Sequence, residues 1–226
     1  MLIEKHSSIR AHDPTLSVPH AVSPDRRELA QGMVRVNHLY RSALKMAVAQ
    51  LEILDEEFAS MYDHSPIHHI EYRIKTLDSI IDKLERRGLA VTIDNIYAHI
   101  QDVAGVRVIC NYLDDIYYMR RLLTRTESFG IKREADYIKE PKDTGYRSLH
   151  LILDVPIVIS EGTLHLPVEV QLRTIAMDMW ASLEHSLRYK ARDAVSDDLQ
   201  ARLQHCAGLA SLLDSEMQAI LRDTER

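Results

Sequence analysis

The feature that most constrains the fold is a long run of apolar residues at helical spacing near the start of the chain. Pro24 follows Ser23, and Asp25 and Glu28 lie in the first turn, which is typical of a helix start. Apolar side chains then recur at alternating steps of four and three residues: Leu29, Met33, Val36, Tyr40, Ala43, Ala47, Leu51, Leu54, Phe58 and Met61. This spacing predicts one amphipathic helix over residues 23–62, longer than a single small sheet can cover.

The rest of the chain alternates between helical and strand-like patterns. The arm over 1–22 contains Pro14 and Pro19 and no periodicity, so we expect it to be flexible. Helical spacing and end signals predict helices over 76–87, 93–100, 114–129, 174–190 and 196–226. β-branched apolar runs predict strands over 103–112, 131–138, 148–159 and 164–172, the last two joined by a hairpin turn over 160–163. We therefore expect an α+β fold, a small mixed β-sheet flanked by helices, with long N- and C-terminal helices.

Composition restricts the class of protein and its partners. A chain of 226 residues with 46% hydrophobic side chains is long enough for one core. The net charge of −6 argues against a protein that coats nucleic acid, although a local basic pocket remains compatible with phosphate ligands. With only Cys110 and Cys206, neither a disulfide framework nor a thiolate metal cluster is expected. Lacking a signal peptide pattern and an apolar run of roughly 18 to 20 residues, the chain is expected to be cytoplasmic, without membrane partners.

Two carboxylates stand out in strand-like surroundings. Asp102 lies at the edge of one predicted strand, and Glu169 lies inside another, in the apolar run LPVEVQL. A carboxylate in such a run requires a cation. On neighbouring strands the two would make a hard oxygen site suited to Mg²⁺ on a nucleotide's phosphates. The alternative is that Asp102 caps a helix and Glu169 pairs with an arginine.

A basic group precedes the carboxylates. Arg73 and Lys75 share one face if that segment is extended, and Lys75, Ser79 and Lys83 share one ridge if it is helical. A helix that begins near Thr76 would also aim free backbone N–H groups at a phosphate. The alternative is a solvated charged face with intrahelical ion pairs.

The third group is the segment DYIKEPKDTGYRSLH, residues 136–150. Lys139, Lys142 and Arg147 supply cations, and Tyr137 and Tyr146 supply rings on which a base could stack. If the strand resumes at Tyr146, then Tyr146, Ser148 and His150 share one face. The alternative is a hairpin loop with a core tyrosine and a buried histidine. His64, His68 and His69 have metal-compatible spacing, but no clustered acids or cysteines accompany them, so a zinc site is disfavoured.

In chain order, the segments RIKTLDSIIDK, IQDVAGVRVIC, DYIKEPKDTGYRSLH, VEVQLRT and MDMWASLEHSLRYK resemble the motifs of the RelA/SpoT-type alarmone synthetase family, in its stand-alone small form. The resemblance covers residues 65–190. It implies a nucleotidyltransferase-like sheet that transfers the β,γ-pyrophosphate of ATP to the 3′-hydroxyl of GDP or GTP, giving (p)ppGpp and AMP. It also implies a catalytic domain over 63–190 and a C-terminal helix over 191–226 that forms a homotetramer.

The resemblance also implies roles for individual residues. Asp102 and Glu169 would hold the cofactor Mg²⁺ and act in catalysis. The residues expected to bind ATP are Arg73, Lys75, Ser79, Lys83 and Arg107. Those expected to bind GDP or GTP are Tyr146, Lys142, His150, Gln171 and Lys139. Glu169 would also help to deprotonate the attacking hydroxyl.

The chain departs from the family pattern in two places. Relatives often carry a basic residue before the Asp-Tyr pair, where this chain has Ala135, with Arg133 two residues earlier on the same strand face. The positions that line a product-binding cleft in some tetrameric relatives are here Val48, Glu52, His69 and Glu71, so product activation is not expected. We also expect no hydrolase activity. Alternatives are a toxin-like synthetase that pyrophosphorylates adenosine nucleotides or tRNA 3′ ends, and a non-enzymatic nucleotide-sensing module.

Overall fold

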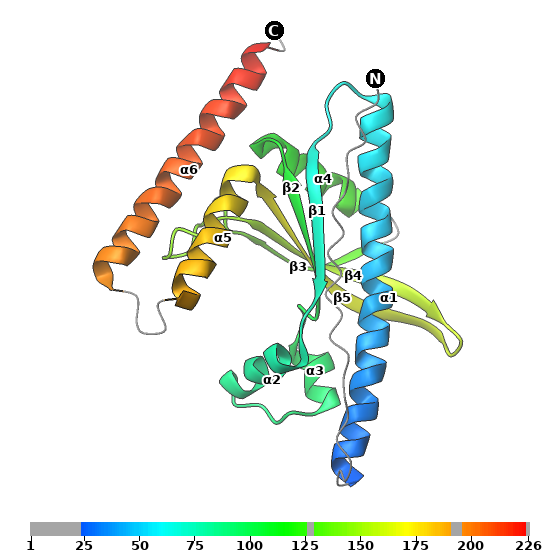
Figure 1. Ribbon diagram of the computed structural model, residues 1–226. Coiled ribbons are helices and arrows are strands. Elements are labelled where there is room, and N and C mark those ends of the chain that lie inside the picture. The colour runs from blue at the N-terminus through cyan, green and yellow to red at the C-terminus, as the bar shows by residue number, and fades with distance from the viewer. Residues whose placement is uncertain (1–23, 126–128, 191–195, 225–226) are drawn as a thin grey trace.

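Five strands form one mixed sheet in the computed structural model, which describes residues 24–125, 129–190 and 196–224 (Figure 1). The predicted arm over 1–22 lies outside these residues. The strands are β1 (Ile67–Ile74), β2 (Ala104–Cys110), β3 (Gly130–Asp136), β4 (Leu149–Ile159) and β5 (Gly162–Thr174). The helices are α1 (Pro24–Met61), α2 (Leu77–Arg86), α3 (Ile93–His99), α4 (Leu113–Arg125), α5 (Ile175–Lys190) and α6 (Asp197–Thr224). The predicted α+β class is confirmed.

The strand order is β1-β2-β5-β4-β3. β2 and β5 run parallel, and the other three pairings are antiparallel. β2 lies inside the sheet, between β1 and β5, with Val106 and Val108 in the core and Arg107 on the opposite face. The turn of Ser160 and Glu161 joins β4 to β5, since Ile159 pairs with Gly162, which agrees with the predicted hairpin.

Strand β1 was not expected from its sequence. Its residues, IHHIEYRI, show no apolar alternation, and of its side chains only that of Ile67 is fully buried. The physical reason is its position: β1 is an edge strand that pairs with β2 alone, so most of its side chains remain accessible to water. Arg73 and the residues around it therefore belong to the sheet.

The long helix α1 covers one face of the sheet. It packs across β1, β2, β4 and β5, and Figure 1 shows it running past the sheet at both ends. Its buried stripe joins one cluster with α4 and the inward-facing residues of the strands, such as Val106, Val170 and Leu151. Because side chains alternate along a strand, the neighbours of these residues in sequence project from the opposite face.

The C-terminal helix α6 packs against α5 and α4. Its inner face carries mostly small and polar residues: Leu203, Ala207, Ala210, Asp214 and Gln218. Of the apolar stripe along α6, Leu203 is buried and Leu199 partly buried, whereas Cys206, Leu213, Met217 and Ile220 are exposed. The stripe exceeds what α6 can bury because the helix contacts the rest of the chain on one side only. Among the described residues, no helix is long and apolar enough to cross a membrane.

The packing of α1 is testable by truncation of one core side chain. Leu51 is fully buried in the cluster beneath the sheet. We expect Leu51→Ala to lower the free energy of unfolding by about 2–5 kcal/mol, through lost burial and an unfilled cavity. Lys45→Ala, at an exposed position of the same helix, should change it by no more than about 0.5 kcal/mol. Urea denaturation followed by circular dichroism measures both, and equal effects would contradict this packing.

Candidate functional site

The polar face of the sheet, opposite α1, brings together residues that are far apart in the sequence. Backbone pairing aligns two rows across the five strands. One row contains Arg73, Gly105, Glu169, Ile152 and Arg133. The other contains Glu71, Arg107, Gln171, His150 and Ala135. Residues directly opposite each other on paired strands share a face. The two rows therefore form one continuous surface, in which Gly105 has no side chain and Ile152 is apolar.

Asp102 precedes β2 and is surrounded by two lysines. Its Oδ2 accepts from Lys75 Nζ at 2.7 Å and lies 2.8 Å from Lys83 Nζ. Lys75 follows β1 and Lys83 lies on α2, so the sheet and the helix both contribute cations. Burial alone would raise the pKa of Asp102, but the hydrogen bonds and charges of the two lysines outweigh it and hold the pKa below its usual value. The carboxylate therefore remains ionised.

Glu169 lies on β5, in the middle of the sheet. Its Oε1 lies 3.2 Å from His150 Nδ1, and its Oε2 accepts from Gln171 Nε2 at 2.8 Å. Burial acts to raise the pKa of this carboxyl, but its contacts with His150 and Gln171 lower the pKa overall, while the charge of Asp102 opposes them. The alternative of an arginine partner for Glu169 is wrong. Its partners are a histidine and an amide.

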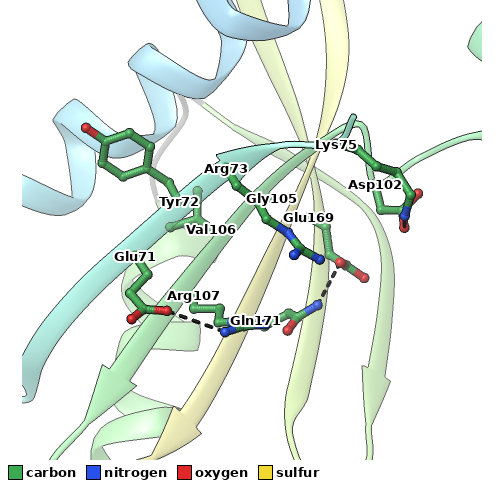
Figure 2. Close-up of a pocket in the computed structure, with 10 residues that line it drawn as sticks. All are labelled: Glu71, Tyr72, Arg73, Lys75, Asp102, Gly105, Val106, Arg107, Glu169 and Gln171. Atoms are coloured by element: carbon green, nitrogen blue, oxygen red, sulfur yellow. Dashed lines mark hydrogen bonds and ion pairs between the residues drawn. The ribbon is translucent and has the colours of Figure 1, made fainter. Parts of the chain in front are cut away.

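A first cavity opens beside this pair, over β1, β2 and β5 (Figure 2). It measures about 110 Å³, and its lining includes Arg73, Lys75 and Arg107. In Figure 2 the side chains of Arg73 and Arg107 project over the same side of the sheet as Glu169. Gly105 lies between Arg73 and Glu169 in the first row, and a Cβ there would meet only open space. Glu71 pairs with Arg107 at 3.4 Å.

A second cavity, of about 410 Å³, lies on the other side of the carboxylates. Asp102 and Glu169 line both cavities. The remaining side chains of the second cavity are mostly cationic or polar: Lys83, Arg87, His99, Gln101, Arg133, Tyr137, Lys142 and His150. Arg133 and Ala135 both line it, which confirms that they share a strand face. The two cavities thus meet at one carboxylate pair.

The loop before β4 holds the predicted acceptor residues. The strand predicted over 148–159 begins at Leu149, so the condition that it resumes at Tyr146 is not met. Gly145 has a φ of 90° and directs the chain into a turn, where Gly145 N donates to Lys142 O at 2.8 Å. Tyr146 nevertheless reaches His150, with its hydroxyl 2.8 Å from Nε2. Lys142 Nζ lies 4.6 Å and 4.8 Å from the ring centres of Tyr137 and Tyr146.

This loop is held from outside by the C-terminal helices. A Cβ on Gly145 would come within 2.7 Å of Ala207 Cβ on α6, and Gln204 Nε2 donates to Asp143 O. Tyr146 packs against a small cluster formed by Trp180, Ala181, Leu203 and Ala207. The position of the loop therefore depends on the docking of α5 and α6.

Two predicted site residues lie apart from the cavities. The Lys139 side chain is 72% exposed, pairs with Asp136 at 3.4 Å and lines neither cavity. Ser79 lies in the first turn of α2, where its backbone N–H donates to Thr76 Oγ1 at 3.3 Å, and it lines neither cavity. The helix start predicted near Thr76 is confirmed.

Sequence reasoning missed several residues of this surface. Gly105 could have been found from the sequence, because a glycine inside a strand often marks a place where a ligand approaches the backbone closely. No local pattern indicated Arg87 or Gln101, since each lies outside the strands and is brought to the second cavity only when the chain folds. Tyr137 lines that cavity, whereas Tyr146 is partly buried against the α5 and α6 cluster.

The residues present fit a hard divalent cation between the cavities. Asp102 Oδ1 is buried and has no hydrogen-bond partner among the described residues. This oxygen is therefore available to coordinate a cation. The described residues contain no group of three or more metal-ligating side chains. Two carboxylates suffice for Mg²⁺, which commonly takes its remaining ligands from water and substrate phosphates. The three histidines at 64, 68 and 69 join no such group either.

Comparison with known proteins gives consistent matches. Residues 72–194 match the model of the region found in RelA / SpoT proteins. The chain is 38% identical over 187 residues to GTP pyrophosphokinase YwaC of Bacillus subtilis, covering 83% of this chain and 89% of the relative. It is 36% identical to GTP pyrophosphokinase YjbM of the same organism over 180 residues, covering 78% and 84%.

Solved structures agree with the sequence matches. The small alarmone synthetase 1 of Bacillus subtilis, bound to its product pppGpp, superposes with a TM-score of 0.77 at 35% identity, covering 83% of this chain and 95% of that one. The same synthetase bound to AMPCPP gives 0.73 at 32% identity, covering 86% and 98%. Because the family region matches more than half of the chain, the chain belongs to the RelA/SpoT family, and its fold is similar to that of a small alarmone synthetase over 83% to 86% of its length.

Proposed function

We propose that the protein is a GTP diphosphokinase that transfers the β,γ-pyrophosphate of ATP to the 3′-hydroxyl of GDP or GTP, giving (p)ppGpp and AMP. The observation that carries this proposal is the meeting of two cavities at one carboxylate pair, Asp102 and Glu169. A transfer between two nucleotides needs a site for each on either side of the reacting atoms. The names of the two Bacillus subtilis relatives support the same activity.

The first cavity is the proposed ATP site. Arg73 and Arg107 present planar guanidinium groups on neighbouring strands, and such groups stack on the faces of a base. Lys75 and Lys83 neutralise Asp102 when no ligand is bound. Lys75 lines the first cavity and Lys83 the second, so these two ammonium groups, which are suited to phosphate oxygens, would contact the ATP phosphates where the cavities meet. Ser79 would contribute from the first turn of α2.

Asp102 and Glu169 would hold Mg²⁺ between the cavities. When bound there, the ion would neutralise phosphate charge and acidify the attacking hydroxyl. The chain's own contribution is to keep both carboxylates ionised, through Lys75 and Lys83 at one and His150 and Gln171 at the other.

Glu169 is the proposed proton acceptor. In the proposed step, the 3′-oxygen of the acceptor forms a bond to the β-phosphorus of ATP, and the bond from that phosphorus to the oxygen bridging it to the α-phosphorus breaks. AMP leaves with the bridging oxygen, and the hydroxyl proton passes to the Glu169 carboxylate.

The second cavity is the proposed acceptor site. Lys142 and His150 line it, and Gln171, which lines the first cavity, lies beside His150 across the β5–β4 pair. Arg133 and Arg87 supply further charge for the acceptor's 5′-phosphates. Arg133 thus offers a cation on the strand face where relatives often use the position of Ala135. Tyr146 is the proposed stacking residue, with Tyr137 beside it, while Lys139 would have to turn toward the cavity to take part.

The acceptor is tested by incubation of ATP and Mg²⁺ with GDP, GTP, AMP or tRNA, followed by nucleotide separation. We expect products with GDP or GTP and none with AMP or tRNA. Modification of AMP or tRNA alone would replace the proposal with the toxin-like alternative.

Glu169→Val removes the proposed base and half of the cation site. We expect transfer to fall by at least about a thousandfold, as is usual for loss of a general base together with a metal ligand, while the circular dichroism spectrum is retained. Glu161→Val, in the exposed β4–β5 turn, is the matched control and should retain activity. Transfer that persists in Glu169→Val would remove this mechanism.

Gly105→Val tests the ATP cavity. A side chain at this position has room in the empty cavity, and a β-branched residue suits a strand, so the fold should survive. The branched side chain would occupy the space between Arg73 and Glu169. We expect the KM for ATP to rise about tenfold, a cost near 1.4 kcal/mol, with the KM for GDP little changed. Gly130→Val, on exposed β3, is the control. A rise in the KM for GDP alone would place ATP elsewhere.

We further propose that the chain forms a homo-oligomer through α5 and α6, as the homotetramers of the family suggest. These helices expose a set of large apolar side chains: Ile175, Met179, Leu183, Leu187, Leu209, Leu212, Leu213, Met217 and Ile220. Patches of this extent usually mark an interface.

Light scattering tests this interface directly. We expect a mass of about four chains by analogy with the family, and a lower mass for Leu213→Glu combined with Met217→Glu. Glu57→Gln, on exposed α1, should not change the mass. A monomeric wild-type chain would contradict the proposal.

A further inference from the structure

Arg173 is a buried guanidinium behind the acceptor site. It lies on β5, two residues beyond Gln171 on the same strand face, and its side chain is only 5% exposed. Its Nη1 donates to Asp178 Oδ1 at 2.9 Å, in the first turn of α5. Its Nη2 donates to Tyr146 Oη at 2.7 Å and to Gln171 Oε1 at 2.8 Å. A buried charge persists only when paired and hydrogen-bonded. These three contacts pair both terminal nitrogens, while the buried Nε has no hydrogen-bond partner among the described residues.

An arginine only donates hydrogen bonds, so it determines the direction of the bonds that follow it. The Tyr146 hydroxyl accepts from Arg173, and its own hydrogen is then available to His150 Nε2, 2.8 Å away. In a neutral imidazole, an accepting Nε2 leaves the hydrogen on Nδ1. His150 Nδ1 then donates to Glu169 Oε1 at 3.2 Å.

The second branch follows the same logic. Because Arg173 Nη2 only donates, the Gln171 atom that faces it is the amide oxygen. The amide nitrogen is therefore turned toward Glu169 Oε2, 2.8 Å away. Both oxygens of Glu169 thus receive a hydrogen-bond donor, and both donors are oriented from one guanidinium group.

We propose that Arg173 is a positioning residue of the acceptor site, which sets the hydrogen-bond direction in the two chains that reach Glu169 through Tyr146 with His150 and through Gln171. This inference rests on the proposed transfer reaction and adds to it a residue that lines neither cavity. Asp178 holds Arg173 in place, so the start of α5 is part of the support of the site.

A purely structural role for Arg173 predicts a different outcome. If Arg173 only anchors β5 to α5, its loss should weaken the fold and impair the binding of ATP and of the acceptor alike. If Arg173 is a positioning residue, its loss should impair only the acceptor side, through the Tyr146 hydroxyl. Arg173→Lys retains the charge beside Asp178 but lacks the planar fork that reaches several partners at once. Tyr146→Phe retains the ring and removes only the hydroxyl.

The test measures steady-state kinetics for the wild type, Arg173→Lys, Tyr146→Phe and the double variant. We expect kcat/KM for GDP to fall about tenfold in each single variant, the size expected for one charge-assisted hydrogen bond, with the KM for ATP within about twofold of wild type. The double variant should lose little more than either single one, because both act on one chain of bonds. Effects that multiply, or equal rises in both KM values, would overturn the proposal.

Arg120→Met is the matched control. Arg120 makes a bidentate contact with Glu134 and lines neither cavity, so the KM of this variant for GDP should remain that of the wild type. A rise equal to that of Arg173→Lys would show that any lost ion pair has the same effect, which contradicts a specific role.

Nitrogen NMR of the Mg²⁺-free, nucleotide-free protein separates this inference from the proposed function. The signal of His150 among the 12 histidines is assigned by its loss in His150→Gln. We expect the hydrogen on Nδ1 in the wild type, and a mixture of tautomers in Arg173→Lys. Hydrogen on Nε2 in the wild type would overturn the proposed bond direction, even in an active enzyme. A wild type that transfers no pyrophosphate would instead contradict the proposed function, whatever the tautomer.

Discussion

The parallel pairing of β2 with β5 is the constraint on which the rest of the site depends. It places Gly105 opposite Glu169 and Arg107 opposite Gln171, so the start of β2, with Asp102 just before it, lies beside Glu169. A slip of one residue in this register would turn Glu169 toward the apolar core beneath α1. The apolar face that α1 and α4 bury therefore also determines which face carries the carboxylates.

Much of this arrangement can be read from the sequence, and the unpredicted parts have identifiable physical causes. Helix α1 follows from apolar spacing, and β2, β4 and β5 follow from apolar β-branched runs. Strand β1 could not be read because an edge strand shows little apolar alternation. The turn before β4 could not be read either, because Gly145 and the contacts of the loop with α6 keep Tyr146 outside the strand. Such contacts between distant segments leave no local pattern.

The site residues show the same division. Asp102 and Glu169 were recognisable because carboxylates next to or within apolar strands require partners, and the ordered motifs indicated which nucleotides they would serve. Lys75 and Lys83 both contact Asp102, although Lys75 precedes α2 and does not share a helical ridge with Lys83. Arg173 was not singled out, because its role depends on three partners at positions 146, 171 and 178, which only the folded chain brings together. The support of the acceptor site thus extends from the sheet into α5.

The central claim is that Asp102 and Glu169 jointly bind the divalent cation between the two nucleotides. A crystal structure with Mn²⁺, a non-hydrolysable ATP analogue and GDP tests it most directly, because Mn²⁺ accepts the same oxygen ligands as Mg²⁺ and can be located by its anomalous signal. The account predicts a Mn²⁺ peak bonded to both carboxylates, with the ATP analogue in the first cavity and GDP in the second. A peak bonded to neither carboxylate, or nucleotides in the reverse order, would contradict it.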